Sequence, residues 1–110
     1  MIYMDIEKCK HLIIEAIDEV KGTEIKSFDT TKNTFLFDLI IIATIESTRQ
    51  ANAILKKILN KKSLFPIKPT IEGSSDSGWI LIDCSDIIVH LMTKQDREYY
   101  NLEELWGSHE

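Results

Sequence analysis

The sequence predicts an α/β fold, in which a single small domain over residues 1–110 holds a mixed sheet of five strands flanked by helices. Three observations lead to this prediction. A chain of 110 residues has the length of one domain. Apolar residues recur at helical spacing in two segments, whereas five other segments have the short apolar runs of strands. The segments follow the order helix, two strands, helix, three strands and a short helix, which is typical of helices packed on a mixed sheet.

The first helix is expected from Ile6 to Lys21, with Asp5 before it as a candidate N-cap. Its apolar residues are mostly three or four positions apart and form one stripe, made of Ile6, Cys9, Ile13, Ala16, Ile17 and Val20. Lys21-Gly22 is expected to end the helix, with Gly22 in the left-handed conformation that glycine tolerates.

The next two segments are predicted to be strands separated by a polar turn. Thr23 to Asp29 has a modest strand pattern, and Phe35 to Thr44 is the most apolar stretch of the chain. Because this second run is nearly continuous, we expect a central strand with both faces covered. Asp38 interrupts the run, either as a strand-entry residue with a backbone or basic partner or as a functional carboxylate.

The second helix is predicted to begin at Ser47, which forms a capping box with Gln50. Its apolar stripe consists of Ala51, Ile54, Leu55, Ile58 and Leu59. Four lysines gather near its C-terminal end, namely Lys56, Lys57, Lys61 and Lys62. They are interpreted either as a solvated helix end, where cations suit the helix dipole, or as a basic patch for RNA.

A stiff connector is expected after this helix, because Pro66 and Pro69 exclude a helix from Leu64 to Pro69. The connector is predicted to be extended or an edge strand, and Thr70 to Glu72 can continue it. Glycine and serine then indicate a flexible loop over residues 73–78.

A β-hairpin is predicted over residues 79–83 and 86–92. Strand alternation places residues of its first strand on opposite faces, with Trp79, Leu81 and Asp83 against Ile80 and Ile82. Both faces are then apolar, so one covers the core and the other has to meet a helix or a partner. Trp79 is interpreted either as a core aromatic or as an interface anchor, since tryptophan is enriched at binding hot spots.

Two short helical segments are expected to close the chain. Thr93 with Asp96 caps the first, which runs to Tyr99 or Tyr100. Asn101 with Glu104 caps a last turn that ends at Trp106, and residues 107–110 are expected to be loose. Arg97 is predicted to pair with an acid such as Asp38 or Glu72, while Tyr100 and Trp106 pack on the sheet.

No catalytic residue is expected in this chain. His90 lies in a predicted strand, where a lone histidine is more often a hydrogen-bonded structural residue than a base. Asp83 and Asp86 resemble the paired carboxylates with which nucleotidyltransferases hold a divalent metal. Positions three apart in a strand point to opposite faces, so this pair cannot share a metal unless the turn brings it together. We therefore expect no metal site and no cofactor.

Charge, cysteine content and hydropathy limit the partners and the compartment. A net charge of −5 argues against a broad basic surface for nucleic acid, but it suits docking on a basic protein. Cys9 and Cys84 lie outside any CxxC pair and are expected to be reduced structural thiols. No apolar run approaches the ~20 residues of a membrane span, and the N-terminus lacks a signal-peptide pattern, which favours a cytoplasmic protein.

An ordered set of motifs extends over nearly the whole chain. Its members are Phe37-Asp38-Leu39-Ile40-Ile41-Ile42-Ala43-Thr44, Ser47-Thr48-Arg49-Gln50, Glu72-Gly73, Trp79 to Asp83, Asp86 to His90, Arg97 with Tyr100, Leu102-Glu103 and Leu105-Trp106. Each motif is weak alone, but their order and spacing are specific. By these residues the chain resembles the ribosomal silencing factor family, also called Iojap-like proteins. Cys84-Ser85 departs from the family, which more often has a glycine in this turn.

The resemblance implies a nucleotidyltransferase-like fold without catalytic carboxylates, and a binding protein rather than an enzyme. It implies a cytoplasmic translational repressor that binds a ribosomal protein on the intersubunit face of the large ribosomal subunit. Occupying that face blocks joining of the small subunit when nutrients run short. Two alternatives stay open, a factor for large-subunit assembly and a minimal nucleotidyltransferase.

The resemblance also points to contact residues. The partner-contacting hydrophobics of the family map onto Trp79 and Ile80, and we add Leu81, Asp83 and Met92 as neighbours. Family members self-associate, so a homodimer is a further expectation, and little direct contact with nucleic acid is expected.

Overall fold

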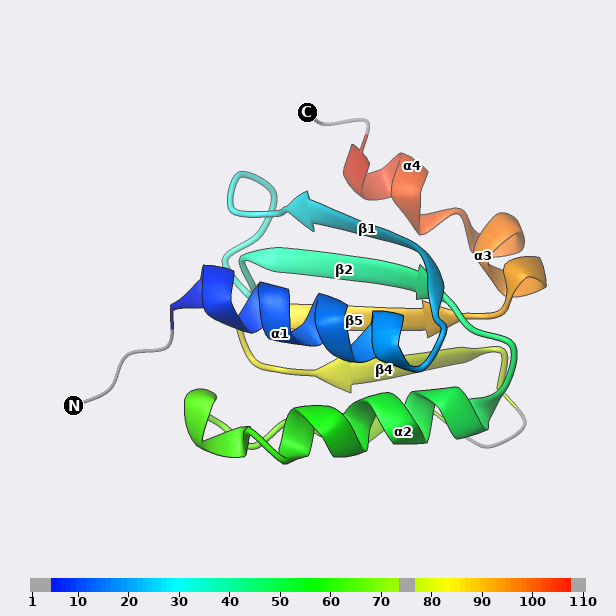
Figure 1. Cartoon of the computed structure of the whole chain (residues 1–110). Coiled ribbons are helices and arrows are strands. Elements are labelled where there is room, and N and C mark those ends of the chain that lie inside the picture. The colour runs from blue at the N-terminus through cyan, green and yellow to red at the C-terminus, as the bar shows by residue number, and fades with distance from the viewer. Residues whose placement is uncertain (1–4, 74–76, 108–110) are drawn as a thin grey trace.

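The computed structural model describes residues 5–73 and 77–107 and confirms a small α/β fold (Figure 1). Its elements are α1 (Ile6–Glu19), β1 (Thr23–Asp29), β2 (Leu39–Thr44), α2 (Thr48–Leu59), the 3-10 helix η1 (Lys62–Leu64), β3 (Thr70–Glu72), β4 (Trp79–Asp83), β5 (Ile87–Met92), α3 (Lys94–Tyr100) and α4 (Leu102–Gly107). The strands form one five-stranded sheet in the order β1-β2-β5-β4-β3.

The sheet is mixed, as expected. Strands β2 and β5 pair in parallel in the centre, with Leu39 opposite Ile87 and Thr44 opposite Met92. The other three pairs are antiparallel, and β4 with β5 is the predicted hairpin. Every residue of β2 is buried, which confirms a central strand covered on both faces.

Helices α1 and α2 lie on the same face of the sheet (Figure 1). The stripe of α1 and the stripe of α2 meet the inward residues of β2, β4 and β5 in the main core. Its fully buried members include Ile13, Ile17, Ile41, Ile54, Ile58, Ile80, Ile82, Val89 and Leu91. Burying one such side chain stabilises the fold by about 1.5–3 kcal/mol, so this face provides most of the driving force for folding.

The opposite face of the sheet, which we call the second face, is only partly covered. Leu102 and Trp106 of α4 pack there with Phe28 and Phe37 over Ile40, Ile42 and Met92. The rings of Phe37 and Trp106 meet edge to face with centroids 5.8 Å apart. This cover lies over β1 and β2, so the second face of β4 stays half-exposed.

Three of the predicted helix caps are confirmed by their hydrogen bonds. The Asp5 carboxylate accepts from the Glu7 amide at 2.9 Å, the Ser47–Gln50 capping box is present, and the Thr93 hydroxyl accepts from the Asp96 amide. At the start of α4, Asn101 Nδ2 donates to Glu104 at 2.7 Å, and the helix runs one residue past Trp106.

The end of α1 differs from the expectation in two respects, the first being that the helix ends at Glu19 and not at Lys21. Lys21, not Gly22, is left-handed with a φ of 70°. The Lys21 and Gly22 amides donate to the carbonyls of Asp18 and Ile17, which is a Schellman motif with lysine in the usual glycine position. Glycine is required at position 22 for space, since a Cβ there would clash with Ile17 Cγ2.

Two predicted boundaries are wrong. Strand β2 begins at Leu39, and the preceding Phe35 and Leu36 are exposed, because the ladder with β1 ends at Asp29 opposite Leu39. The Asp38 side chain is exposed at the strand entry, so it does not require the basic partner we considered. Leu64 ends a 3-10 helix, so the connector begins after it, and residues 65–67 of the connector are bends and not part of a strand.

Candidate partner-docking surface

Strand β4 alternates as predicted. Ile80 and Ile82 are buried in the main core, while Trp79, Leu81 and Asp83 lie half-buried on the second face. Two of the five expected contact residues are placed out of reach of a partner. Ile80 lies under α1 and α2, and Met92 is enclosed on the second face with Ile40 and Ile42. Because neither side chain has exposed surface, both can only support the residues that do.

Trp79 is held in place by a histidine of the neighbouring strand. Its indole Nε1 donates a 2.9 Å hydrogen bond to His90 Nδ1, and the two rings are 5.7 Å apart. An accepting Nδ1 carries no proton, so the neutral ring is protonated at Nε2. Burial lowers the pKa of His90 to about 4. His90 is therefore neutral at pH 7 and orients Trp79, which fits the structural role expected of it.

Trp79 continues into a row of aromatic side chains from α3. The Tyr100 ring lies 4.8 Å from Trp79, and the Tyr99 ring lies 5.0 Å from Tyr100. Tyr99 is 79% exposed and Tyr100 is 49% exposed. We call Trp79, Tyr99 and Tyr100 the aromatic row. Sequence reasoning missed Tyr99, because no spacing rule relates α3 to the start of β4. It expected Tyr100 to pack on the sheet, and the contact of its ring with Trp79 of β4 agrees with this.

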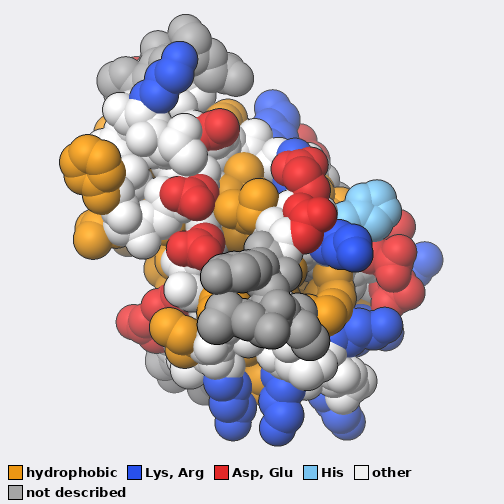
Figure 2. Space-filling model, turned by 90° about the vertical axis from the view of Figure 1, so that its left-hand side faces the viewer, with side chains coloured by type: hydrophobic (Ala, Val, Ile, Leu, Met, Phe, Trp, Pro, Cys, Tyr) orange, Lys and Arg blue, Asp and Glu red, His pale blue; other side chains and the backbone are white. Residues whose placement is uncertain are grey.

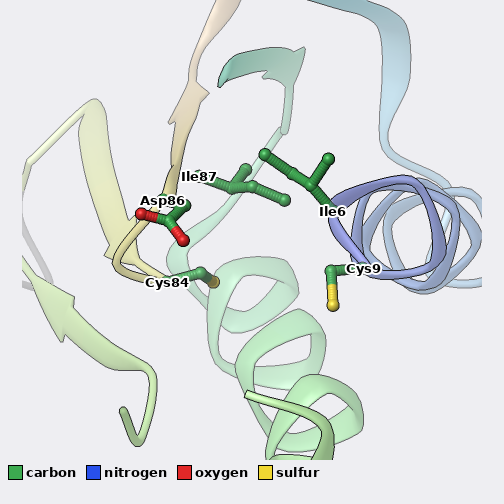
Figure 3. A pocket seen from close by; sticks show the side chains of 5 residues that line it. All are labelled: Ile6, Cys9, Cys84, Asp86 and Ile87. Carbon is green, nitrogen blue, oxygen red and sulfur yellow. The ribbon is translucent and has the colours of Figure 1, made fainter. Parts of the chain in front are cut away.

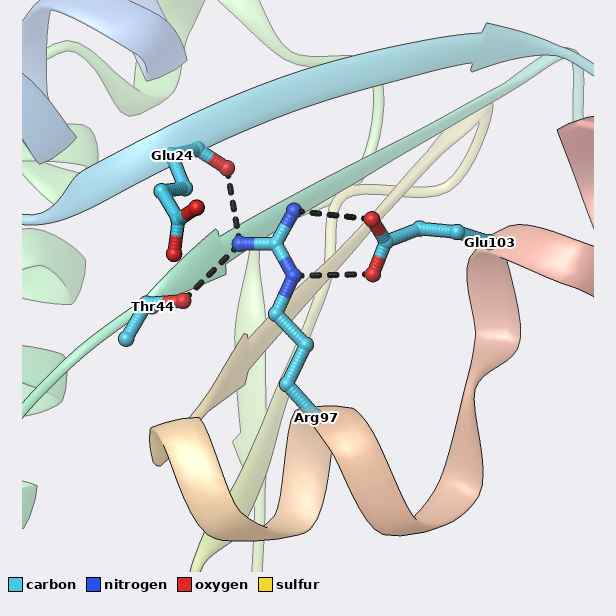
Figure 4. A network of polar contacts seen from close by, with 4 residues as sticks. All are labelled: Glu24, Thr44, Arg97 and Glu103. Atoms are coloured by element: carbon cyan, nitrogen blue, oxygen red, sulfur yellow. Dashed lines mark hydrogen bonds and ion pairs between the residues drawn. The ribbon is translucent and has the colours of Figure 1, made fainter.

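The position of α3 depends on Arg97, whose guanidinium is buried in a polar network (Figure 4). Its Nη1 donates to the Glu24 carbonyl at 2.7 Å and to the Thr44 hydroxyl at 2.9 Å. Its Nε and Nη2 donate to the two carboxylate oxygens of Glu103 at 2.8 and 3.3 Å. These hydrogen bonds, chiefly, lower the pKa of the Glu103 carboxyl.

The predicted acid partners of Arg97, Asp38 and Glu72, are therefore wrong. The partner is Glu103, six residues along the chain, past the left-handed Asn101 at which the chain turns from α3 into α4. A bulge in β1, with Glu24 at a φ of 49°, directs the Glu24 carbonyl toward Arg97. The network joins α3 and α4 to the first two strands and thereby holds Tyr99 and Tyr100 of α3 beside Trp79.

Asp83 takes part in the turn of the hairpin. Its Oδ1 accepts from the Ser85 amide at 2.8 Å, and Ser85 has a φ of 71°. The Cys84 amide donates to the Ile87 carbonyl and closes the turn. Within residues 5–73 and 77–107, no group of three or more His, Cys, Asp or Glu side chains is arranged to hold a metal ion.

The two cysteines lie on either side of a small pocket between α1 and the hairpin turn, lined also by Ile6, Asp86 and Ile87 (Figure 3). Burial, followed by the nearby Asp5 carboxylate, raises the pKa of Cys9 to about 11. Burial, followed by Asp83 and Cys9, raises the pKa of Cys84 to about 12. Both are protonated thiols at neutral pH, so neither is activated as a nucleophile.

Comparison with known proteins identifies relatives of this chain. The model of a protein family described as "Ribosomal silencing factor during starvation" matches residues 4–110. The ribosomal silencing factor of Chromobacterium violaceum is 37% identical over 105 residues, which are 94% of this chain and 86% of that protein. A mouse protein named for mitochondrial assembly of the ribosomal large subunit is 29% identical over 73 residues, covering 63% of this chain and 32% of its own.

A solved structure supports the same relationship. The crystal structure of a Chromobacterium violaceum protein superposes with a TM-score of 0.82 at 37% identity, and the match covers 94% of this chain and 88% of the other. In the part of the chain that the structure describes, no helix has the length and apolarity needed to cross a membrane.

Proposed function

Since the chain belongs to the ribosomal silencing factor family, we propose that it is a translational repressor that acts on the large ribosomal subunit. In this proposal it binds a ribosomal protein on the intersubunit face, and its bulk blocks joining of the small subunit when nutrients are limiting. The observation that carries the proposal is the half-exposed second face of β4, where Trp79 together with Tyr99 and Tyr100 of α3 presents aromatic surface beyond the cover of α4.

The aromatic row and its neighbours have the properties of a binding hot spot. Trp79 and Tyr100 are large aromatic side chains whose rings contact each other, and Trp79 is also held by its hydrogen bond to His90. Rigid aromatic anchors lose little conformational entropy on binding and dominate interface energies. Leu81 and Asp83 continue the surface along β4. We propose these four residues as direct contacts, supported from beneath by Ile80 and Met92.

The charge of the molecule favours a protein target. With a net charge of −5 the chain is attracted to the basic proteins of the ribosome and repelled by its RNA, so direct nucleic-acid contact is minor. The lysines near the end of α2 are exposed, and Lys57 pairs with Glu19 at 3.1 Å. They fit a solvated helix end.

The proposed mechanism is steric and takes place in the cytoplasm. It involves no catalysis, cofactor or metal ion, and a specific interface of roughly 1,200–2,000 Å² in total is sufficient. If two copies associate through the Trp79 face as well, a homodimer competes with the ribosome for this surface.

Subunit joining provides the direct test. Light scattering is recorded while purified small and large subunits join, with and without the protein. We expect the wild type to prevent the rise in scattering and Trp79→Ala to restore it, because loss of a hot-spot tryptophan costs about 2 kcal/mol or more of binding free energy. Leu105→Ala, at an exposed position of α4, is the matched control and should still block joining. Normal joining at saturating wild-type protein would exclude the proposal.

A second candidate function is assembly of the large subunit, which the name of the mouse relative favours. The two functions predict different results in cells that lack the protein. Assembly predicts that immature large subunits accumulate during growth in rich medium. Silencing predicts mature subunits and an excess of joined ribosomes during starvation. Sedimentation of extracts from both conditions separates the two.

A further inference from the structure

Glu72 belongs to one of the sequence motifs, yet neither the fold nor the proposed contacts give its carboxylate a role. Arg97, one partner considered for it, pairs with Glu103 instead. Glu72 ends β3, an edge strand of the sheet, and it is exposed. Because the antiparallel register sets Glu72 opposite Leu81, both side chains lie on the second face. Strand β3 therefore extends the proposed docking surface beyond β4.

A second carboxylate lies on this face beside Glu72. Asp83 follows Leu81 by two residues in β4, so it points to the same side of the sheet. Glu72 and Asp83 are diagonal neighbours across the β3–β4 pair, a relation that places them about 7–8 Å apart in an antiparallel sheet. Leu81 is thus an apolar contact residue with one carboxylate on its own strand and one on the edge strand.

No basic side chain pairs with these two carboxylates in the described part of the chain. Asp83 accepts from the Ser85 amide, but an amide does not cancel its charge. Lys68 is the basic residue closest to Glu72 in the sequence. It lines, together with Asp83, a surface hollow that Leu36 and Ile67 also border, and it forms no ion pair there.

Other cations lie away from the pair. The cross-strand row that starts with Glu72 and Leu81 ends at Lys26 of β1, on the opposite edge of the sheet. Four strand spacings separate Lys26 from Glu72, which is roughly 19 Å. Viewed from the end with the hairpin turn, acidic side chains flank exposed hydrophobic ones, while the densest group of Lys and Arg lies at the lower edge, on the side of α2 (Figure 2).

We propose that Glu72 and Asp83 each receive a Lys or Arg side chain of the ribosomal protein, while an apolar residue of that protein packs on Leu81. The inference rests on the proposed function and names the chemistry of the partner at this part of the interface. Protein interfaces commonly have an apolar centre and a charged border, and complementary charges there select the partner and its orientation. RNA phosphates would be repelled from the same place. Glu72 is then a specificity-determining residue beside the aromatic row.

Charge reversal at matched positions tests the contact. Glu72→Lys and Glu15→Lys change the net charge equally, but Glu15 is exposed on α1, which covers the other face of the sheet (Figure 1). At 50 mM salt we expect Glu72→Lys to raise the Kd for purified large ribosomal subunits at least ~10-fold, because attraction becomes repulsion, and Glu15→Lys to leave it within about twofold. The difference should narrow at 200 mM salt, roughly where surface charges are screened.

The thermal midpoint shows that both variants fold. It should stay close to that of the wild type, since the Glu72 carboxylate has no ion-pair partner to lose in the described part of the chain. An unchanged Kd for Glu72→Lys would remove the proposed contact. An equal rise for Glu15→Lys would do the same, because the effect would then come from net charge and not from this position.

Photo-crosslinking identifies what covers β3. Thr70 lies opposite Asp83 and is exposed, so p-benzoylphenylalanine at position 70 probes the edge strand and leaves both carboxylates in place. Position 100, in the aromatic row, and position 15 are replaced in separate full-length proteins. Each protein is irradiated with large subunits, and the products are identified by mass spectrometry. We expect positions 70 and 100 to crosslink to the same ribosomal protein and position 15 to give no product.

The remaining outcomes distinguish failure of the inference from failure of the proposed function. Crosslinking of position 70 to RNA, to a second copy of this chain or to nothing, while position 100 reaches a ribosomal protein, overturns the inference and leaves the proposed function intact. If the wild-type chain does not bind large subunits and position 100 gives no product, the proposed function fails and the inference fails with it.

Discussion

His90 shows how one buried side chain can link pH to the geometry of a docking surface. It accepts the indole hydrogen bond of Trp79 through Nδ1, so protonation there would remove the acceptor. Its pKa is lowered by burial, which means that the unfolded chain binds the proton more tightly than the folded one.

The expected consequence is a loss of stability in mild acid. The unfolded pKa of His90 is about 6.5 and the folded pKa is about 4, so the free energy of unfolding should fall by up to about 3 kcal/mol as pH decreases through this range. Above pH 6.5 the contribution of neutral His90 to stability should be fully present. Urea unfolding at pH 7.5, 6 and 4.5 measures this. His90→Gln, which cannot titrate, is the control and should show a smaller change over this range. Equal pH profiles for the two proteins would contradict the role given to His90.

Ser85 occupies a backbone conformation that favours glycine. Its φ of 71° costs a non-glycine residue of order 1 kcal/mol. Ser85→Gly should therefore raise the free energy of unfolding by about 0.5–1 kcal/mol, seen as a higher midpoint in urea. Ser27→Gly, within extended β1, should lower it instead, because glycine weakens a strand interior. A destabilised Ser85→Gly protein would show that the Ser85 side chain contributes more than the backbone strain.

At the scale of elements, the Arg97 network decides where α3 and α4 lie. Arg97 joins α3 to the Glu24 carbonyl of β1, to Thr44 of β2 and to Glu103 of α4. No other ionic contact in these elements is buried in the described part of the chain. The aromatic row depends on this attachment, because Tyr99 and Tyr100 are carried by α3.

Breaking the network should destabilise the fold and loosen these two helices selectively. Arg97→Met leaves the Glu103 carboxylate, the buried Thr44 hydroxyl and the Glu24 carbonyl without their guanidinium partner, and we expect the free energy of unfolding to fall by about 2–4 kcal/mol. Hydrogen exchange should accelerate in α3 and α4 before α1 and α2. Arg49→Met, at an exposed position of α2, provides the comparison and should change stability little. Uniform acceleration over the whole chain would argue against a local role.

For the whole molecule, the net charge of −5 determines how binding is expected to respond to salt. Binding of an acidic chain to a basic protein should weaken as salt rises from 50 to 200 mM, roughly within the range over which surface charges become screened.

Replacing Lys56, Lys61 and Lys62 by Gln should leave the Kd for large subunits within about twofold, since these lysines lie away from the docking surface. A large loss of affinity in this variant would instead support the RNA-binding interpretation of the lysines.

Elements could be predicted from the sequence where a local rule applies. Asp5, Ser47 and Thr93 cap helices because their side chains reach amides only two or three residues ahead. The hairpin was predictable because its apolar runs alternate around a short polar break. The start of β2 was not, because the hydrophobicity of Phe35 and Leu36 does not reveal that the pairing strand has already ended. Lys21 was missed because the helix-end rule expects glycine at the left-handed position, whereas Gly22, one position later, is needed here for the space beside Ile17.

The candidate site was predicted in part. Placing Trp79, Leu81 and Asp83 on one face follows from strand alternation alone, and the structure agrees. Strand alternation also separates Ile80 from that face, yet the resemblance had included it among the contacts. Met92 is on the second face but buried, because neighbouring strands and α4 enclose it.

The sequence by itself determined the α/β class, the order of the elements, the two faces of β4 and the family, since all of these depend on local periodicity and on motif order. Only the tertiary structure decided which acid pairs with Arg97, which aromatic side chains extend Trp79, and that Leu36 and Ile67 share one hollow. These contacts join residues from separate elements or across a turn. Their geometry is set by how the sheet and helices pack, and no local spacing encodes it.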